Sequence, residues 1–187
     1  MINKTWPVLL LQLIFLLHNC TACSPDNRLL YDPNFDEHAQ CLDASESPNF
    51  DYSCTIEVNG QPPEGSCLSL VYNVNILLKG KTASYENVCV TCLLNSVVQD
   101  LLSNSRKYFG TDVSEQITLS KENSALGVAL STWIEDAVPR SQLQNCLEKP
   151  FKVKVKWAHG EEYVLIDDQE IKLYSVENGQ TGGEERW

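Results

Sequence analysis

Residues 86–102 read ENVCVTCLLNSVVQDLL, and their secondary structure determines the class of fold that the chain adopts. The apolar residues of this stretch fall at positions 90, 93, 94, 97, 98, 101 and 102, which matches the 3.6-residue period of an amphipathic helix. The next residues include Arg106, Lys107 and Gly110, which are residue types typical of a helix end. We therefore predict a helix over 86–105 with a broad apolar stripe.

A second helix is predicted from Ser120 to Val138, because Ser120 is a favourable N-cap and Pro139 ends the pattern. Its apolar stripe consists of Leu126, Leu130, Trp133 and Ile134. A third, short helix is expected over RSQLQNCLE, residues 140–148.

Strands are predicted on both sides of the helical region. The stretches DYSCTIEVNG (51–60) and SCLSLVYNVNILLKG (66–80) flank a loop rich in proline and glycine. Residues 151–176 alternate apolar and polar side chains, with turns at His159-Gly160 and Asp167-Asp168. This pattern predicts a three-stranded antiparallel meander, whose lysine face should meet water and the acids of the neighbouring strand.

These elements together predict an α+β fold, in which an antiparallel sheet is covered on one face by two helices and stapled by disulfides. The sheet would contain the strands near 51–79 and 151–176. The cystatins share this helix-on-sheet architecture, although their Gln-x-Val-x-Gly loop is absent here. The resemblance to cystatins therefore concerns shape only.

The first residues have the layout of a secretory signal peptide, with one lysine before an apolar run from Val8 to Leu17. Cleavage after Ala22 satisfies the small-residue rule and leaves seven cysteines, whereas cleavage after Cys23 leaves an even number, six. We therefore expect a signal peptide over 1–23, a single secreted domain over 24–178 and a flexible C-terminal tail over 179–187. The expected location is extracellular.

An exported chain reaches an oxidising compartment, where cysteines are usually paired. We expect disulfides among six residues, whose fifteen possible connectivities the sequence leaves open. They are Cys41, Cys54, Cys67, Cys89, Cys92 and Cys146. In the predicted helix Cys92 faces away from the sheet, so a segment carrying Cys41 would cross the outer face to reach it.

The CVTC stretch at 89–92 leaves two other interpretations open. A C-x-x-C pair at the start of a helix is how thioredoxin-like thiol-disulfide oxidoreductases lower a thiol pKa, and Cys89 and Cys92 would then be the redox pair. The stretch CVTCLLNSVVQDLL also resembles the first helix of a saposin-type lipid-binding domain, which would imply a lipid ligand.

The net charge and the absence of known catalytic motifs reduce the number of function classes that the sequence supports. The formal net charge is −11, which repels nucleic acid and anionic membrane surfaces. The sequence shows no recognisable catalytic, metal or cofactor motif, and no membrane-spanning segment is expected after the signal peptide. We therefore expect a secreted binding or inhibitor-type protein that acts through loop contacts on an extracellular protein or small ligand. The candidate binding residues are Gln61, Pro62, Pro63, His159 and Gly160.

Overall fold

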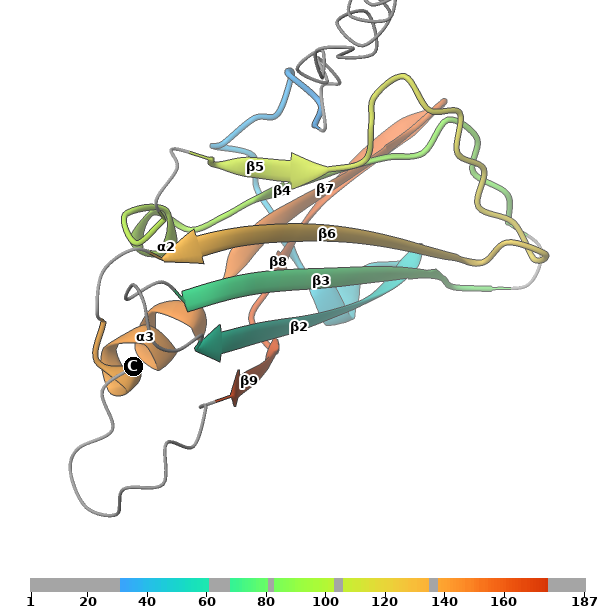
Figure 1. Ribbon diagram of the computed structural model, residues 1–187. Coiled ribbons are helices and arrows are strands. Elements are labelled where there is room, and N and C mark those ends of the chain that lie inside the picture. Colours follow the sequence, from blue (N-terminus) through green and yellow to red (C-terminus); the bar gives the residue numbers. More distant parts are fainter. Residues whose placement is uncertain (1–30, 61–67, 81–82, 103–105, 135–137, 175–187) are drawn as a thin grey trace, which may run out of the picture.

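Two β-sheets lie face to face and enclose the apolar side chains between them (Figure 1). The computed structural model describes residues 31–60, 68–80, 83–102, 106–134 and 138–174. Figure 1 shows the sheet that contains β6, β3, β2 and β9 in front of the sheet that contains β5, β4, β7 and β8. The described part of the chain is therefore a β-sandwich.

The five-stranded sheet has the order β1-β8-β7-β4-β5. Its strands are β1 (Leu42–Asp43), β4 (Cys89–Leu93), β5 (Tyr108–Gly110), β7 (Phe151–Trp157) and β8 (Gly160–Ile166). All pairings in it are antiparallel except the parallel pairing of β1 with β8. A short 3-10 helix, η1 (Ala44–Glu46), follows β1.

The four-stranded sheet has the order β6-β3-β2-β9. Its strands are β2 (Phe50–Gly60), β3 (Leu68–Leu78), β6 (Ala125–Ile134) and β9 (Glu170–Tyr174). The strands β2, β3 and β6 pair antiparallel, whereas β9 runs parallel to β2. The predicted strands at 51–60 and 66–80 are confirmed by β2 and β3.

Every second residue of the long strands faces the space between the sheets. Tyr72, Phe50 and Phe109 are the largest side chains buried there, together with many valine, leucine and isoleucine residues. The backbones of β4 and β5 approach so closely that a Cβ added to Gly110 would lie 1.9 Å from the carbonyl oxygen of Val90. Glycine is therefore required at position 110.

The predicted helix over 86–105 is wrong, because Cys89–Leu93 form β4 and only Ser96–Gln99 form a helix, α2. Both faces of β4 are covered by protein, so its residues lack the polar face that marks a half-buried strand. The apolar spacing beyond residue 93 reflects α2, where the Asn95 side chain accepts a hydrogen bond from the Val98 amide at 3.1 Å. The apolar residues of β4 and of α2, taken together, therefore have the spacing that one long helix would have.

The predicted helix from Ser120 to Val138 is also wrong, because Ala125–Ile134 form β6. Side chains at even positions face the core, and the side chains at odd positions, which are small except for Trp133, face outward. Ser120 forms a turn instead of an N-cap, since its hydroxyl accepts hydrogen bonds from the amides of Glu122 and Asn123 at 3.3 and 3.4 Å. Serine and asparagine are common both in turns and at helix N-caps, and the alanine and leucine residues of this stretch favour a helix over a strand.

The C-terminal meander is correct for its first two strands only. Strands β7 and β8 form the predicted antiparallel hairpin, with the turn at Ala158 and His159. Residues 167–169 then lead the chain from one sheet to the other, so β9 pairs with β2 instead of β8. The two predicted groups of strands consequently belong to two stacked sheets instead of one.

The predicted α+β fold is therefore corrected to a β-sandwich, because the sheets pack on each other and not under two helices. Within the described residues, the helix α3 (Arg140–Leu147) alone reaches seven residues, and it confirms the short third helix. It lies at one end of the sandwich (Figure 1), where Leu143 and Leu147 are buried. The Gln169 side chain donates a hydrogen bond to the Leu147 carbonyl at 2.7 Å and ties α3 to the crossing between the sheets.

Candidate functional site

The outer face of the five-stranded sheet is covered by the N-terminal segment 31–40, which we call the strap. Three lysines of β7 contact the strap. The Lys152 ammonium donates to the Glu37 carbonyl at 2.6 Å, and those of Lys154 and Lys156 lie 3.0 and 3.4 Å from the Asp32 carboxylate. The expectation that the lysine face meets water is wrong for the buried Lys154 and the half-buried Lys152, whereas the Lys156 side chain is 46% exposed. The expected contact with an acid of the neighbouring strand is confirmed, because Lys154 lies 3.0 Å from the Glu161 carboxylate.

Asp32 and Lys154 form a buried ion pair, with only 4% and 2% of each residue exposed. Burial alone would raise the pKa of the Asp32 carboxyl, but the amide of Asn34 and the Lys154 ammonium together lower it. Burial would likewise lower the pKa of Lys154, yet its hydrogen bonds to Asp32 and Glu161 raise it. Both groups are therefore charged at neutral pH, and their attraction holds the strap against the sheet.

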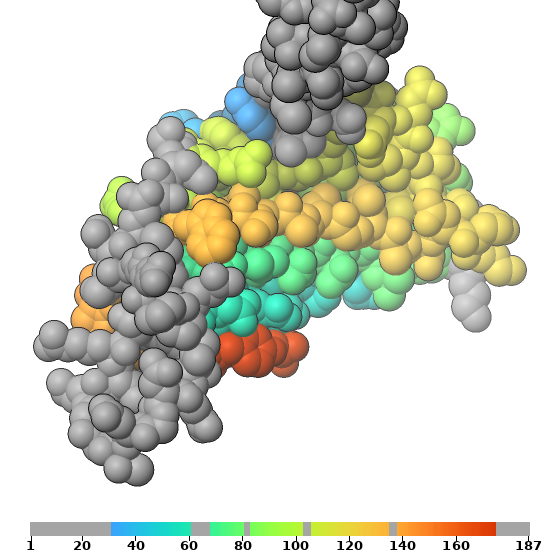
Figure 2. All heavy atoms as spheres, viewed as in Figure 1, coloured from blue at the N-terminus to red at the C-terminus, as the bar shows by residue number. Residues whose placement is uncertain are grey.

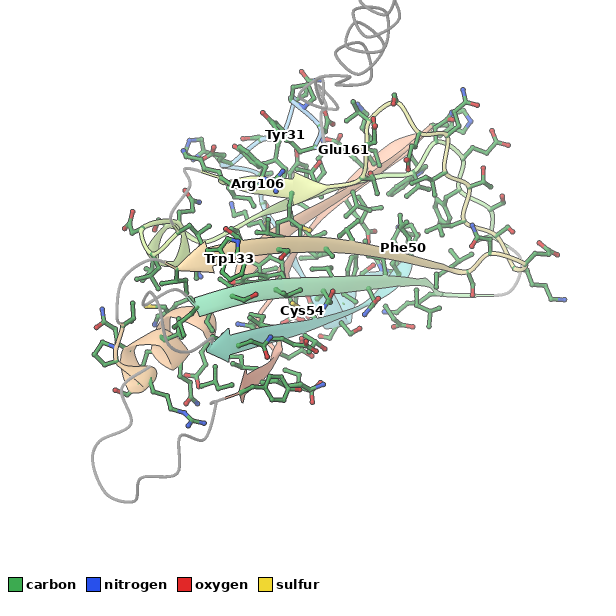
Figure 3. The ribbon with its side chains drawn as sticks, in the orientation of Figure 1. Tyr31, Phe50, Cys54, Arg106, Trp133 and Glu161 are labelled. Atoms are coloured by element: carbon green, nitrogen blue, oxygen red, sulfur yellow. The ribbon has the colours of Figure 1, made fainter. Side chains whose placement is uncertain are left out.

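Aromatic rings complete the contact between the strap and the sheet. Tyr31 stacks on Tyr108 of β5 with 5.0 Å between ring centroids, and Phe35 packs against both Tyr108 and Tyr163. The Tyr108 hydroxyl donates a hydrogen bond to the Glu37 carboxylate. Tyr31 and Glu161, labelled in Figure 3, both lie on the strap side of this sheet. Much of this face is consequently closed to a partner.

A second buried carboxylate, Glu162, faces the interior near the β7–β8 turn. It accepts hydrogen bonds from Ser47 and Asn49 at 2.7 Å each and from the Tyr52 hydroxyl at 2.5 Å. Burial and this carboxylate both raise the pKa of Tyr52. Because its partners come from the segment that joins η1 to β2 and from the start of β2, Glu162 fixes this part of the chain to β8.

The cysteine pair at 89–92 lies on a strand, so the helix start that both alternatives for this stretch require is absent. Residues three apart on a strand point to opposite faces. Cys92 faces the core, fully buried, whereas Cys89 is on the strap side and half-buried. The expected outward direction of Cys92 is therefore wrong, and Cys89 cannot reach it.

Burial also controls the reactivity of the inward thiols. It raises the pKa of Cys92 well above the ordinary value and that of Cys54 to about 12. A thiol in such surroundings is a poor nucleophile at neutral pH. The five described cysteines, Cys41, Cys54, Cys89, Cys92 and Cys146, are unpaired in this structure, and Cys67 lies outside the described residues. Disulfide bonding stays a prediction.

Of the five loop residues predicted to bind a partner, two are described, and they are neighbours in one turn. His159 is exposed in the β7–β8 turn, and Gly160 packs so closely on Trp157 that an added Cβ would lie 2.9 Å from the indole ring. Gln61, Pro62 and Pro63 lie outside the described residues. Among the predicted binding residues that are described, only His159 and Gly160 are adjacent, and they belong to a single turn.

The outer face of the four-stranded sheet, which we call the open face, lies on the other side of the sandwich from the strap, and its charged residues belong to only two of its strands. Figure 2 views the molecule onto this face, where β6, β3, β2 and β9 lie side by side. Strands β6 and β3 contain no charged residue, although 21% of the chain is charged. The charges of the open face belong to β2 and β9, so half of it is neutral.

One row of residues crosses the open face from edge to edge. Trp133 pairs with Ser69, Ser69 with Asn59, and Asn59 with Tyr174. The exposed fractions of Trp133 and Tyr174 are 45% and 49%. Because neighbouring strands lie about 4.8 Å apart, the two aromatic residues are roughly 14 Å from each other, with a hydroxyl and an amide between them. Figure 3 shows Trp133 near the α3 end of β6.

Sequence reasoning missed this row because it placed Trp133 in a buried helical stripe. The signal that could have found it is the alternation of small residues with larger apolar ones in ALGVALSTWI. Ala125, Gly127, Ala129 and Ser131 share the outer face with Trp133, whereas Leu130 and Ile134 point inward. Tyr174 could not be placed beside it without knowing that β9 joins β2.

Other kinds of site have less support in the described ranges. No group of three or more histidine, cysteine or acidic side chains gathers there in a way that could hold a metal ion. No helix in the same ranges has the length and apolar content that crossing a membrane requires.

No family model matches this chain, and no curated protein matches it. Among solved structures, the chain is similar to the X-ray structure of Northeast Structural Genomics Consortium target SoR45, at 12% sequence identity. The similarity covers 63% of this chain and 82% of that chain, with a TM-score of 0.32. The function proposed below therefore rests on the residues of this chain alone.

Proposed function

We propose that the protein is a secreted, extracellular binding protein that docks a protein partner on the open face of its four-stranded sheet. The row formed by Trp133, Ser69, Asn59 and Tyr174 carries this proposal. Tryptophan and tyrosine dominate the binding energy of protein interfaces, and charged residues are depleted from interface centres. The apolar run at 8–17 and the cysteine content support export.

The shape of the open face favours a protein over a small molecule. Small side chains such as Gly127 and Ala129 alternate along β6, so its outer side presents little relief between Ala125 and Trp133. A protein surface can cover such a face, whereas a small ligand needs a concave site to lose most of its contact with water. The partner would place apolar groups on the two aromatic residues and hydrogen-bonding groups over Ser69 and Asn59.

The test is affinity capture from extracellular fluid of the source organism, with the wild-type protein compared with Trp133→Ala and Tyr174→Ala. We expect a specific protein that the wild type captures and that each variant loses by about tenfold or more, because hot-spot aromatic residues contribute at least 2 kcal/mol. The matched control is Val113→Ala, which trims another exposed apolar residue away from the open face.

The variants must first show unchanged circular dichroism and thermal unfolding. Recovery of the same proteins by the wild type and both aromatic variants would contradict the proposal. Light scattering in solution adds a second readout. A dimer that Trp133→Ala dissociates would show that the open face binds another copy of the chain and not a different protein.

A further inference from the structure

A cavity of about 270 Å³ lies beside the strap, away from the open face. Its walls come from five parts of the sequence that the fold brings together. They are Glu37 of the strap, the segment 93–99, Lys107, the segment 150–152 and Leu165. A cavity assembled from such distant segments exists only in the folded protein.

Apolar and polar side chains are mixed in the walls of the cavity. Leu93 and Leu165 lie on either side of Lys152 on the outer face of the sheet, because both pair with it in the strand register. The amides of two further residues each use one N–H on a backbone carbonyl: Gln99 donates to Leu94 at 2.6 Å, and Asn95 donates to Lys149 at 3.1 Å. The cationic donors among the described wall residues are Lys107 and Lys152.

Lys107 and Lys152 give the cavity a positive charge in a chain whose net charge is −11. Lys152 donates to the carbonyls of Glu37 and Ala39 at 2.6 and 3.4 Å, and neither acceptor cancels its charge. An ammonium has three N–H donors, so one is left. Neither lysine forms an ion pair with a residue in the described ranges, and the single acid in the walls, Glu37, already accepts a hydrogen bond from Tyr108.

The volume of the cavity limits the size of the ligand that it can hold. At roughly 30 Å³ per water molecule it would hold about nine waters, and it lies just below the range of roughly 300 to 1,000 Å³ usual for drug-sized ligands. A molecule of about ten non-hydrogen atoms is the appropriate scale.

We propose that this cavity binds a small organic anion, with its apolar body against Leu93 and Leu165 and its acidic group between Lys107 and Lys152. The site is independent of the open face, so the two proposals can fail separately. With a neutral ligand, Glu37 would be the single acid among the described wall residues to balance two ammonium groups. A larger anion would exceed the volume of the cavity. A purely inorganic anion would leave the apolar wall residues uncovered.

Phenylacetate serves as the probe, and phenylacetamide is the neutral molecule of nearly the same shape. We expect phenylacetate to shift the amide NMR signals of Leu93, Gln99 and Lys152 in the mature protein. Its affinity should exceed that of phenylacetamide by about tenfold, the scale of one hydrogen bond to a charged group. The affinity should also fall as salt concentration rises.

Lys107→Met is the decisive variant, because the Lys107 amine makes no hydrogen bond to a described residue and its removal leaves the strap contacts in place. It should weaken phenylacetate binding about tenfold and leave phenylacetamide binding unchanged. Lys121→Met removes an exposed lysine from the turn before β6 and is the control that should change neither. Equal affinities for the two probes, or no shift at these residues while the protein stays folded, would overturn the proposal.

Discussion

Lys154 illustrates how a single side chain can hold a whole segment in place. Its ammonium lies within 3.0 Å of carboxylates on both the strap and β8, and it sits 5.2 Å from the centroid of the Tyr163 ring. A charge that is 2% exposed persists only where partners replace water. The strap is therefore bound to the sheet by electrostatics as well as by the stacking of its aromatic rings.

Replacing Lys154 with methionine keeps most of the length of the side chain, removes its charge and leaves Asp32 buried with weaker partners. We expect the free energy of unfolding, measured by urea denaturation, to fall by about 3 kcal/mol, because removing one member of a buried pair is strongly destabilising. The double variant Lys154→Met with Asp32→Leu should recover part of the loss.

The control for this experiment is Lys172→Met, which removes the exposed pair that Lys172 forms with Glu170 on the open face. That change should have no measurable effect on stability. Equal losses in Lys154→Met and Lys172→Met would show that the strap contributes no buried ion pair.

At the level of elements, strands in which apolar and polar side chains alternate can be predicted from the sequence. Strands that lack this alternation cannot. Residues 51–60 and 151–166 alternate clearly, and their strands were predicted. The strand at 89–93 has no solvent-exposed polar face, because the strap covers Thr91 on its outer side. The cover is contributed by residues about 60 positions away, so no local pattern could reveal it.

The candidate site was equally hard to predict, because it depends on pairing between distant strands. The sequence places His159 and Gly160 together in one turn, and this turn was found. Trp133 and Tyr174 meet on one face only because β6, β3, β2 and β9 pair in a particular order. Long-range order of this kind is not encoded in the spacing of neighbouring residues.

Two glycines in strands provide a matched test of the strand packing. Gly110→Ala would place a methyl group 1.9 Å from the Val90 carbonyl oxygen, whereas Gly127→Ala meets only the Asn75 side chain at 3.4 Å. We expect Gly110→Ala to lower the free energy of unfolding by about 2 kcal/mol or more, because backbone must move. Gly127→Ala should leave stability unchanged or slightly raised when thermal unfolding is compared. Similar behaviour of both variants would show that β4 and β5 do not approach closely.

For the whole molecule, the strap makes stability depend on pH at both extremes. The pKa of Asp32 is lower in the folded protein than its ordinary value of 3.8, so its contribution is present above that value and is lost as pH falls through the folded pKa. The pKa of Tyr108 is raised from 10.0 to about 12 by burial and by its hydrogen bond to Glu37. Its contribution is present below pH 10 and is lost as pH rises toward 12.

Urea unfolding measured from pH 2 to pH 11 should therefore show a broad maximum near neutrality, with the acid decline beginning below about pH 4. In Asp32→Asn the acid decline should become shallower and the alkaline decline should persist. An unchanged acid decline in this variant would assign the effect to other carboxyl groups.

The strap also sets the order in which the fold can be completed. Its anchors on β7 and β8 lie more than 110 residues further along the chain, and β9 must travel back to β2 in the same way. During synthesis the first described segment therefore waits until nearly the last strand has emerged. Contacts of such long range are associated with folding times of milliseconds to seconds. Until then Tyr31 and Phe35 have no sheet to cover, so a ribosome-bound chain that stops before residue 151 would expose them to chaperones.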